Sequence, residues 1–198
     1  MDRMNIVDHV RREKTSLLDE LNSLCDDQNR SLRIDEIFMK IEEIKKLVHQ
    51  YAPTMIAYDI QTEGKDIVID TLNNCQVRIY GVPSSLRLIS LTNCRIYTGP
   101  IQTSAYVEKC DECRFEIIAQ QIRIHDTKKC DFYLHVKSRI IIENSFGLRF
   151  APYQWSYERL DDDFQRANID RNVNNYKCID DFDCVQNPSP NWSLIPLE

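Results

Sequence analysis

The sequence predicts a mainly β protein: a β-solenoid preceded by an α-helical hairpin. From residue 67 onward a nine-residue pattern recurs, with apolar residues at its first and third positions and a cysteine at its ninth. The copies are IVIDTLNNC, LRLISLTNC, AYVEKCDEC and IRIHDTKKC. Repeats of roughly 20 residues built from short strands indicate stacked coils, each burying its apolar face against its neighbours.

The N-terminal part of the chain has a different period. Apolar residues recur every three or four positions in 4–27 and again in 33–51, which is typical of amphipathic helices. A polar break separates the two stretches, and Ser31 can cap the second helix. Pro53 ends it. We therefore predict a helical hairpin in 1–52 and a solenoid domain in 53–198.

The recurring cysteines are expected inside the solenoid. Cys75, Cys94, Cys113 and Cys130 are separated by 19, 19 and 17 residues, so one thiol falls at the same place in each coil. A short strand pattern follows each of them: QVRIY, RIYTG, RFEIIA and DFYLHV. The repeat is lost after residue 150, where we expect an irregular segment that closes the solenoid end or wraps its side.

Composition excludes several classes of protein. The net charge of −6 does not favour binding to nucleic acid or to an anionic membrane. No apolar run approaches the ~18 residues of a membrane span, and the N-terminus lacks the apolar region of a signal peptide. We expect a soluble cytoplasmic protein. Residues 78–149 carry 11 Lys and Arg against 7 Asp and Glu, which fits either a docking surface for an anionic partner or a solvated face.

Two motifs have chemical alternatives. Cys110-x-x-Cys113, with His125 and Cys130 nearby, could suggest zinc, but the coil period explains the cysteines as buried structural thiols, and we expect no metal. A nucleophilic cysteine beside His125 is disfavoured because the period places the thiols inside. The chain has neither a GxxxxGK[ST] nor a GxGxxG loop, so we expect no nucleotide site and no cofactor of its own.

Arg123 is the candidate for a special role. Ile122 and Ile124 alternate with Gln121, Arg123 and His125, so in a strand these three polar side chains form an outward row. A second strand follows at 139–143. An outward arginine is usually solvated or half of a surface ion pair. Gln120, Gln121 and Glu143 favour a role for Arg123, because they could hold its side chain in a fixed pose.

Several runs of the sequence resemble the tubulin-folding cofactor C (TBCC) family of C-CAP/cofactor C-like domains. They are AQQIRIH at 119–125, IIE at 141–143, GLRFAPY at 147–153, and the tail DDFD at 180–183 followed by SPNWS at 189–193. The resemblance implies a right-handed parallel β-helix, which agrees with the repeat. It also implies a chaperone that activates GTP hydrolysis in trans, without enzymatic activity of its own.

The family's site residues fall on matching positions of this chain. The resemblance makes Arg123 the arginine finger, with Gln120 and Glu143 as supporting residues. It implies β-tubulin in the α/β-tubulin heterodimer as the target, tubulin-folding cofactors D and E as partners, and a cytoplasmic, cytoskeleton-associated location. We expect partner contacts from four further residues: Gln121, His125, Arg139 and Arg149.

Three alternatives remain open. The target could be an Arf-like small GTPase, because a family branch acts on such proteins. The chain could instead be an actin-binding β-helix of the cyclase-associated type, although Arg123 within QQxRxH argues against this. It could also be a non-catalytic scaffold.

Overall fold

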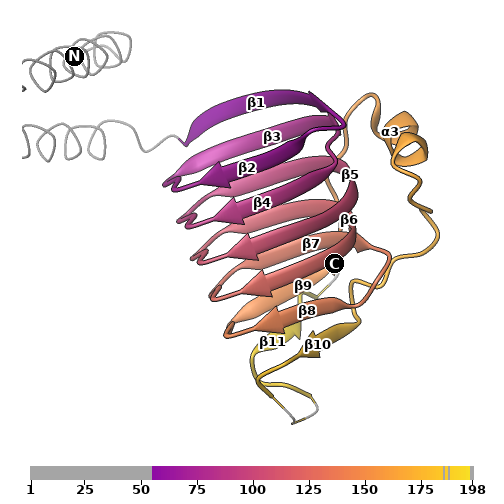
Figure 1. Cartoon of the computed structure of the whole chain (residues 1–198). Helices are drawn as coiled ribbons and strands as arrows, with labels where there is room; N and C mark the ends of the chain where they lie inside the picture. The colour runs from indigo at the N-terminus through magenta and orange to yellow at the C-terminus, as the bar shows by residue number, and fades with distance from the viewer. Residues whose placement is uncertain (1–54, 185, 187, 197–198) are drawn as a thin grey trace, which may run out of the picture. The chain divides into compact units, whose positions relative to one another are not determined.

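The computed structural model describes residues 55–196 apart from 185 and 187. Within these ranges every named strand pair is parallel, and the strands stack into a β-solenoid, as the repeat predicts (Figure 1). The predicted helical hairpin and the domain boundary before Pro53 lie outside the described residues and stay predictions. No helix of the described ranges combines the length and the apolar content that a bilayer crossing requires.

In the part of the chain that the structure describes, the coils are built from parallel strands, and one helix of seven residues lies beyond them. The elements in chain order are β1 (Ile56–Glu63), β2 (Asp66–Asp70), β3 (Cys75–Val82), β4 (Ser85–Ile89), β5 (Arg95–Glu108), β6 (Arg114–His125), β7 (Asp131–Val136), β8 (Ile140–Glu143), β9 (Leu148–Pro152), α3 (Leu160–Arg166), β10 (Ile179–Asp181) and β11 (Trp192–Leu194).

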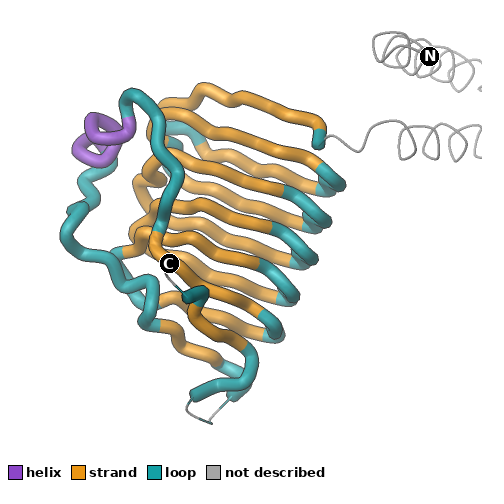
Figure 2. The backbone as a smooth tube through the Cα atoms, turned by 180° about the vertical axis from the view of Figure 1, so that it is seen from behind, coloured by secondary structure: helices purple, strands orange, loops and turns teal. Residues whose placement is uncertain are grey.

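The strands form two faces of the solenoid. The first sheet contains β1, β3, β7, β9 and β11, together with the starts of β5 and β6. The second contains β2, β4, β8 and β10, together with the ends of β5 and β6. β5 and β6 bend between the two faces, so one hydrogen-bonded network runs around the corner. Figure 2 shows the coils stacked one upon another.

The opposite corner of each coil turns through residues with positive φ. Thr71 has φ of 55° and Asn74 has φ of 54°, and the same two places recur in the following coils. Asparagine tolerates this left-handed conformation better than most residues do, and glycine adopts it without strain. In the coil that ends at β9, Gly147 occupies the second place with φ of 65°.

The interior is an array of in-register ladders. Cys75 lies opposite Ile56 of β1, and the thiol position continues through Cys94, Cys113 and Cys130, all buried. The residue after each cysteine pairs with the neighbouring coil, as expected from the strand pattern that follows each cysteine in the sequence. Beside them, the rings of Phe115, Phe132 and Phe150 stack with centroids 4.9 and 5.5 Å apart.

The segment after residue 152 both wraps the side and closes the end. It runs back along the stack of coils to α3 (Figure 1). There Leu160 and Phe164 pack on Val82 and Ile118. The chain then returns, and β10 and β11 pair with β8 and β9. Both of the alternatives predicted for this segment are therefore present.

Candidate functional site

Arg123 lies on the outer surface of the second sheet. Its neighbours Ile122 and Ile124 are 0% and 1% exposed and point into the core, while Arg123 is exposed, as the alternation predicts. Strand pairing places one residue of each neighbouring coil beside it. This outward column, called the Arg123 column below, consists of Val68, Arg87, Tyr106, Arg123, Ile141 and Asp180.

The Arg123 guanidinium is not committed to the protein's own groups. It makes no hydrogen bond or salt bridge with any residue in the described ranges. Arg139, which lies on β8's approach to the same sheet, differs: it donates from Nε and Nη2 to the two carboxylate oxygens of Asp180, at 2.7 and 2.5 Å. Arg123 can therefore project toward another molecule without breaking a contact that the described residues supply.

A second outward column runs two residues further along the strands. It consists of Asp70, Ile89, Glu108, His125 and Glu143. Glu143 lies directly opposite His125 and diagonally from Arg123, on the adjacent strand β8. The structure therefore brings Glu143 and His125 to the same surface as Arg123, and the exposed Glu143 carboxylate is free of salt bridges within the described ranges.

His125 belongs to a small cluster of charged groups. Its Nδ1 lies 3.3 Å from Oδ2 of Asp126 and 3.9 Å from Oε1 of Glu108. These three ligand atoms are close enough to hold a metal ion together. However, the ammonium of Lys109 lies 3.1 Å from the same Glu108 oxygen. The arrangement is accordingly that of a surface ion-pair cluster.

Gln120 and Gln121 occupy the start of the second-sheet part of β6. The side chain of Gln120 is held by one hydrogen bond, because its Nε2 donates to the backbone carbonyl of Gln102 at 2.7 Å. The backbone carbonyl of Gln120 accepts from the backbone amide of Ser138 at 3.0 Å. Gln121 pairs with Ser104 and lies two residues before Arg123, on the same side of the strand. Both glutamines therefore lie on the same strand as Arg123, three and two residues before it.

Arg149 is not part of this surface. It lies on β9 of the first sheet, opposite Asp131, and donates from Nε and Nη2 to that carboxylate at 2.6 and 2.7 Å. Of the four residues predicted to contact a partner, Gln121, His125 and Arg139 share the second sheet with Arg123, whereas Arg149 belongs to the other sheet.

The buried cysteines of the described coils are held by backbone hydrogen bonds. The thiols of Cys110, Cys113 and Cys130 donate to backbone carbonyls two residues before them, at 3.3, 3.2 and 3.1 Å. Burial raises the pKa of Cys110 to about 12, and the hydrogen bond with Cys130 together with burial raises that of Cys113 to about 12. Cys110, Cys113 and Cys130 are free and buried, and the raised pKa values of Cys110 and Cys113 keep those two thiols protonated at neutral pH, as expected of structural thiols.

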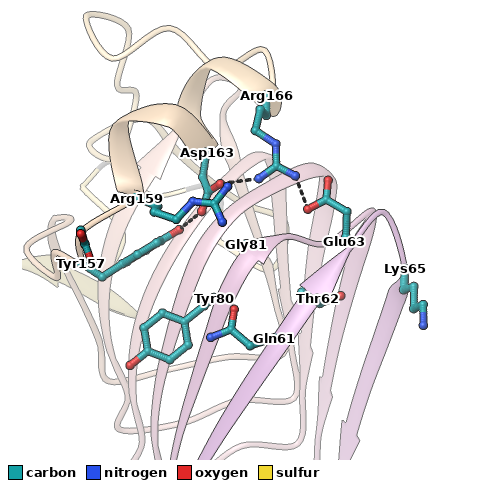
Figure 3. Close-up of a pocket in the computed structure, with 11 residues that line it drawn as sticks. Gln61, Thr62, Glu63, Lys65, Tyr80, Gly81, Tyr157, Arg159, Asp163 and Arg166 are labelled. Carbon is teal, nitrogen blue, oxygen red and sulfur yellow. Dashed lines mark hydrogen bonds and ion pairs between the residues drawn. The ribbon is translucent and has the colours of Figure 1, made fainter.

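A pocket lies elsewhere in the described domain. Figure 3 shows it between β1, β3 and the α3 segment, with a volume of about 550 Å³. Tyr157 donates to Asp163 at 2.7 Å, and Arg166 bridges Asp163 and Glu63. None of the predicted site residues lines this pocket, and the buried Asp163 carboxylate is satisfied by these neighbours. It is a structural seam between the wrapping segment and the first coils.

Two surface residues beside Arg123 escaped the sequence analysis. Tyr106 pairs directly with Arg123, and the guanidinium carbon of Arg87 lies 5.3 Å from the centre of the Tyr106 ring. The signal was present in the repeat, because both occupy the second position of the nine-residue pattern, as Arg123 does. Comparing that position across the copies would have assembled the column.

Comparison with known proteins identifies the family. The family model "Tubulin binding cofactor C" matches residues 64–182. The chain is 43% identical to human tubulin-specific chaperone C over 136 residues and 41% identical to Arabidopsis thaliana tubulin-folding cofactor C over 140 residues. These alignments cover 68% and 69% of this chain, and 39% and 41% of the relatives. It is also 32% identical to Protein XRP2 of Danio rerio over 133 residues, 67% of this chain and 35% of that protein.

A solved structure has the same fold. Tubulin Binding Cofactor C from Leishmania major superposes with a TM-score of 0.59 at 24% identity, covering 65% of this chain and 88% of that one. The chain matches about two fifths of the length of its curated relatives. On the family model and these identities, the chain belongs to the tubulin binding cofactor C family.

Proposed function

We propose that this chain activates GTP hydrolysis by tubulin in trans, with Arg123 as the arginine finger. The relatives are named as tubulin-specific chaperones, so tubulin is the first target to test. In this proposal, the β-tubulin of the α/β heterodimer carries the nucleotide and tubulin-folding cofactors D and E take part in the assembly. The protein would act in the cytoplasm, in association with the cytoskeleton.

The single observation that carries the proposal is the state of Arg123: an outward arginine, on a regular strand, without an ion-pair partner in the described ranges. Phosphoryl transfer spreads negative charge over the γ-phosphate oxygens and the leaving oxygen. A guanidinium that enters a water-excluding interface stabilises this charge, and such fingers accelerate hydrolysis by roughly 10³- to 10⁵-fold.

The coils support the finger geometrically. Arg123 is flanked in its strand by Ile122 and Ile124, both fully packed in the core, so its backbone cannot drift. Gln120 is fixed by Gln102 at the base of the same strand, and Glu143 lies on the next strand with a free carboxylate. We assign Gln120 and Glu143 the role of orienting Arg123 once the partner closes over it.

The test is phosphate release from GTP-loaded tubulin in the presence of cofactors D and E. Adding this protein should accelerate release, and Arg123→Ala should abolish the acceleration while leaving the fold and the binding to tubulin intact. A variant that stimulates as well as the unmodified protein would remove Arg123 from the mechanism.

The same assay distinguishes the other candidates. If the unmodified protein binds tubulin without stimulating hydrolysis, the chain is a scaffold in this assembly. If it neither binds nor stimulates, the assay is repeated with an Arf-like GTPase loaded with GTP, and Arg123-dependent stimulation there would replace tubulin as the target.

A further inference from the structure

The Arg123 column extends across three coils before Arg123. Strand pairing places Tyr106, Arg87 and Val68 one, two and three strands away on β5, β4 and β2. Because neighbouring strands are about 4.8 Å apart, Val68 lies roughly 14 Å from Arg123 across the sheet. All three side chains leave the sheet on the same side as Arg123.

These residues have the composition of a protein-binding hot spot. Val68 is 61% exposed and lies directly opposite Arg87 on the neighbouring strand. Arg87 is exposed, stacks on the Tyr106 ring at 5.3 Å, and forms no salt bridge with a described residue. Tyrosine and arginine are enriched among the residues that contribute most to binding energy, so Tyr106 and Arg87 are the main contributors expected here and Val68 is an apolar contact beside them.

The position of the column fixes what must cover it. Rigid interfaces of ordinary size bury about 800 Å² on each partner, a patch roughly 30 Å across. A GTPase that receives Arg123 in its nucleotide site must present the surrounding surface to the residues around Arg123. On a rigid sheet, side chains about 5 to 14 Å away fall within such a patch.

Charge decides the direction in which the patch extends. Beyond Arg123 on the other side, the column ends in Asp180, whose carboxylate is already paired with Arg139, whereas Arg87 has no salt bridge within the described residues. The two unpaired guanidinium groups of the column, Arg87 and Arg123, attract a partner surface that carries nucleotide phosphates and acidic side chains. The β2–β4–β5 side is therefore the complementary one.

We propose that Val68, Arg87 and Tyr106 form the docking anchor for the GTPase on which Arg123 acts. This proposal rests on the proposed function of Arg123. It differs in giving the binding of the GTPase to Val68, Arg87 and Tyr106, while Arg123 accelerates hydrolysis. Arg87 pairs with a carboxylate of the partner beside its nucleotide site. Tyr106 and Val68 contact an apolar surface there, and the Arg87–Tyr106 stack holds the arginine ready for that contact.

The experiment uses the full chain and separates binding from turnover. Stimulated phosphate release from GTP-loaded tubulin with cofactors D and E is measured as a function of the concentration of this protein, for Arg87→Ala, Tyr106→Ala and Val68→Ser. Each substitution should raise the half-saturating concentration, by about 10-fold or more for Arg87 and Tyr106, with the maximal rate unchanged. Arg123→Ala should abolish the stimulated rate while leaving direct binding to the tubulin assembly unchanged.

The matched control is Arg95→Ala. Arg95 lies at the other end of the same strand β5, is also exposed and free of salt bridges in the described ranges, but faces outward from the first sheet. It should behave like the unmodified protein in both parameters. Tyr106→Phe separates the ring from the hydroxyl, and thermal melting of every variant excludes a folding defect as the cause.

The outcomes of this experiment separate the anchor from the finger. If Arg87→Ala and Tyr106→Ala keep the half-saturating concentration of the unmodified protein while Arg123→Ala is inactive, the anchor is wrong and the finger stands. If they weaken direct binding to the tubulin assembly while Arg123→Ala stimulates normally, the anchor stands and the finger is wrong. An equal effect of Arg95→Ala would reduce the anchor to general electrostatic attraction and overturn it.

Discussion

Arg149 and Asp131 face each other across β9 and β7, joined by two parallel hydrogen bonds of 2.6 and 2.7 Å. This fork lies on the outer surface of the first sheet. Arg123 projects from the second sheet, around the corner of the coil. The arginine of the run GLRFAPY, predicted above to contact a partner, is therefore paired within its own sheet.

Arg149→Ala should accordingly leave GTPase stimulation unchanged. The pair is more than half exposed on the arginine side, so its loss should lower the free energy of unfolding by less than about 1 kcal/mol. Phosphate release and urea denaturation measure the two effects. A large loss of stimulation in a folded variant would return Arg149 to the interface.

Arg123→Lys should not restore stimulation. Lysine keeps the charge but loses the planar fork that can reach two oxygens at once, and its ammonium holds its water more tightly. We expect the lysine variant to lose most of the stimulated rate, about 10²-fold or more, while binding persists. Single-turnover hydrolysis on preassembled complexes measures the rate without contribution from binding. Substantial rescue by lysine would mean that charge alone suffices.

Glu116→Gln should destabilise the domain. This side chain is 1% exposed and accepts three hydrogen bonds: from Nη2 of Arg114 at 2.6 Å and from the backbone amides of Gln154 and Trp155 at 2.9 and 3.0 Å. An amide group removes the charge and turns a donor toward these donors. We expect a loss of about 2–4 kcal/mol in the free energy of unfolding, measured in urea.

A surface carboxylate provides the control for this measurement. Glu112 is exposed, and its nearest cation is Lys129 at 3.5 Å. Glu112→Gln should change stability by no more than about 0.5 kcal/mol. Similar losses for the two variants would show that Glu116 does not hold the wrapping segment.

Acid should release the C-terminal tail. Partial burial disfavours the charged form of Asp181, but hydrogen bonds from Ser189 and Asn191 outweigh it and hold the pKa of Asp181 below its ordinary value. The unfolded tail therefore takes up a proton first as the pH falls. The stabilisation is complete above about pH 4 and is lost as the pH falls through the lowered pKa of the docked state.

Trp192 reports this release, because its ring packs on Phe150 with centroids 6.1 Å apart. In a Trp155→Phe background, the fluorescence of Trp192 should change below about pH 4. In Asp181→Asn, the tail should be loosened already at neutral pH, and this acid step should shrink. An unaltered acid transition in that variant would assign it to another carboxylate.

The solenoid could be predicted because particular residue types recur at fixed positions in each coil. One cysteine per coil and apolar residues at two fixed positions specify which side chains are inside, and the structure confirms that assignment for all four thiols and for Ile122 and Ile124. The same alternation placed Arg123 outside. Alternation is a local property of a strand, so the sequence alone was sufficient.

The division of the surface into two sheets could not be read in this way. Alternation tells whether Arg149 points in or out, but not which face of the coil its strand belongs to, since that depends on where each coil bends. The contact that anchors the wrapping segment could not be predicted either, although the wrapping itself was expected. In this contact the Glu116 carboxylate accepts from backbone amides 38 and 39 residues later in the chain. Every residue except proline has a backbone amide, so the sequence does not indicate which amides Glu116 binds.

The buried cysteines allow the local opening of each coil to be measured separately. Cys75, Cys94, Cys113 and Cys130 each mark a different coil, and each is sealed from solvent in the folded domain. A thiol reagent can reach any of them only when its coil opens, so the rate at which each is labelled measures how often that level of the stack comes apart. Mass spectrometry of the labelled peptides would then rank the coils by how often they open, and would show whether the coil that carries Arg123 opens least often.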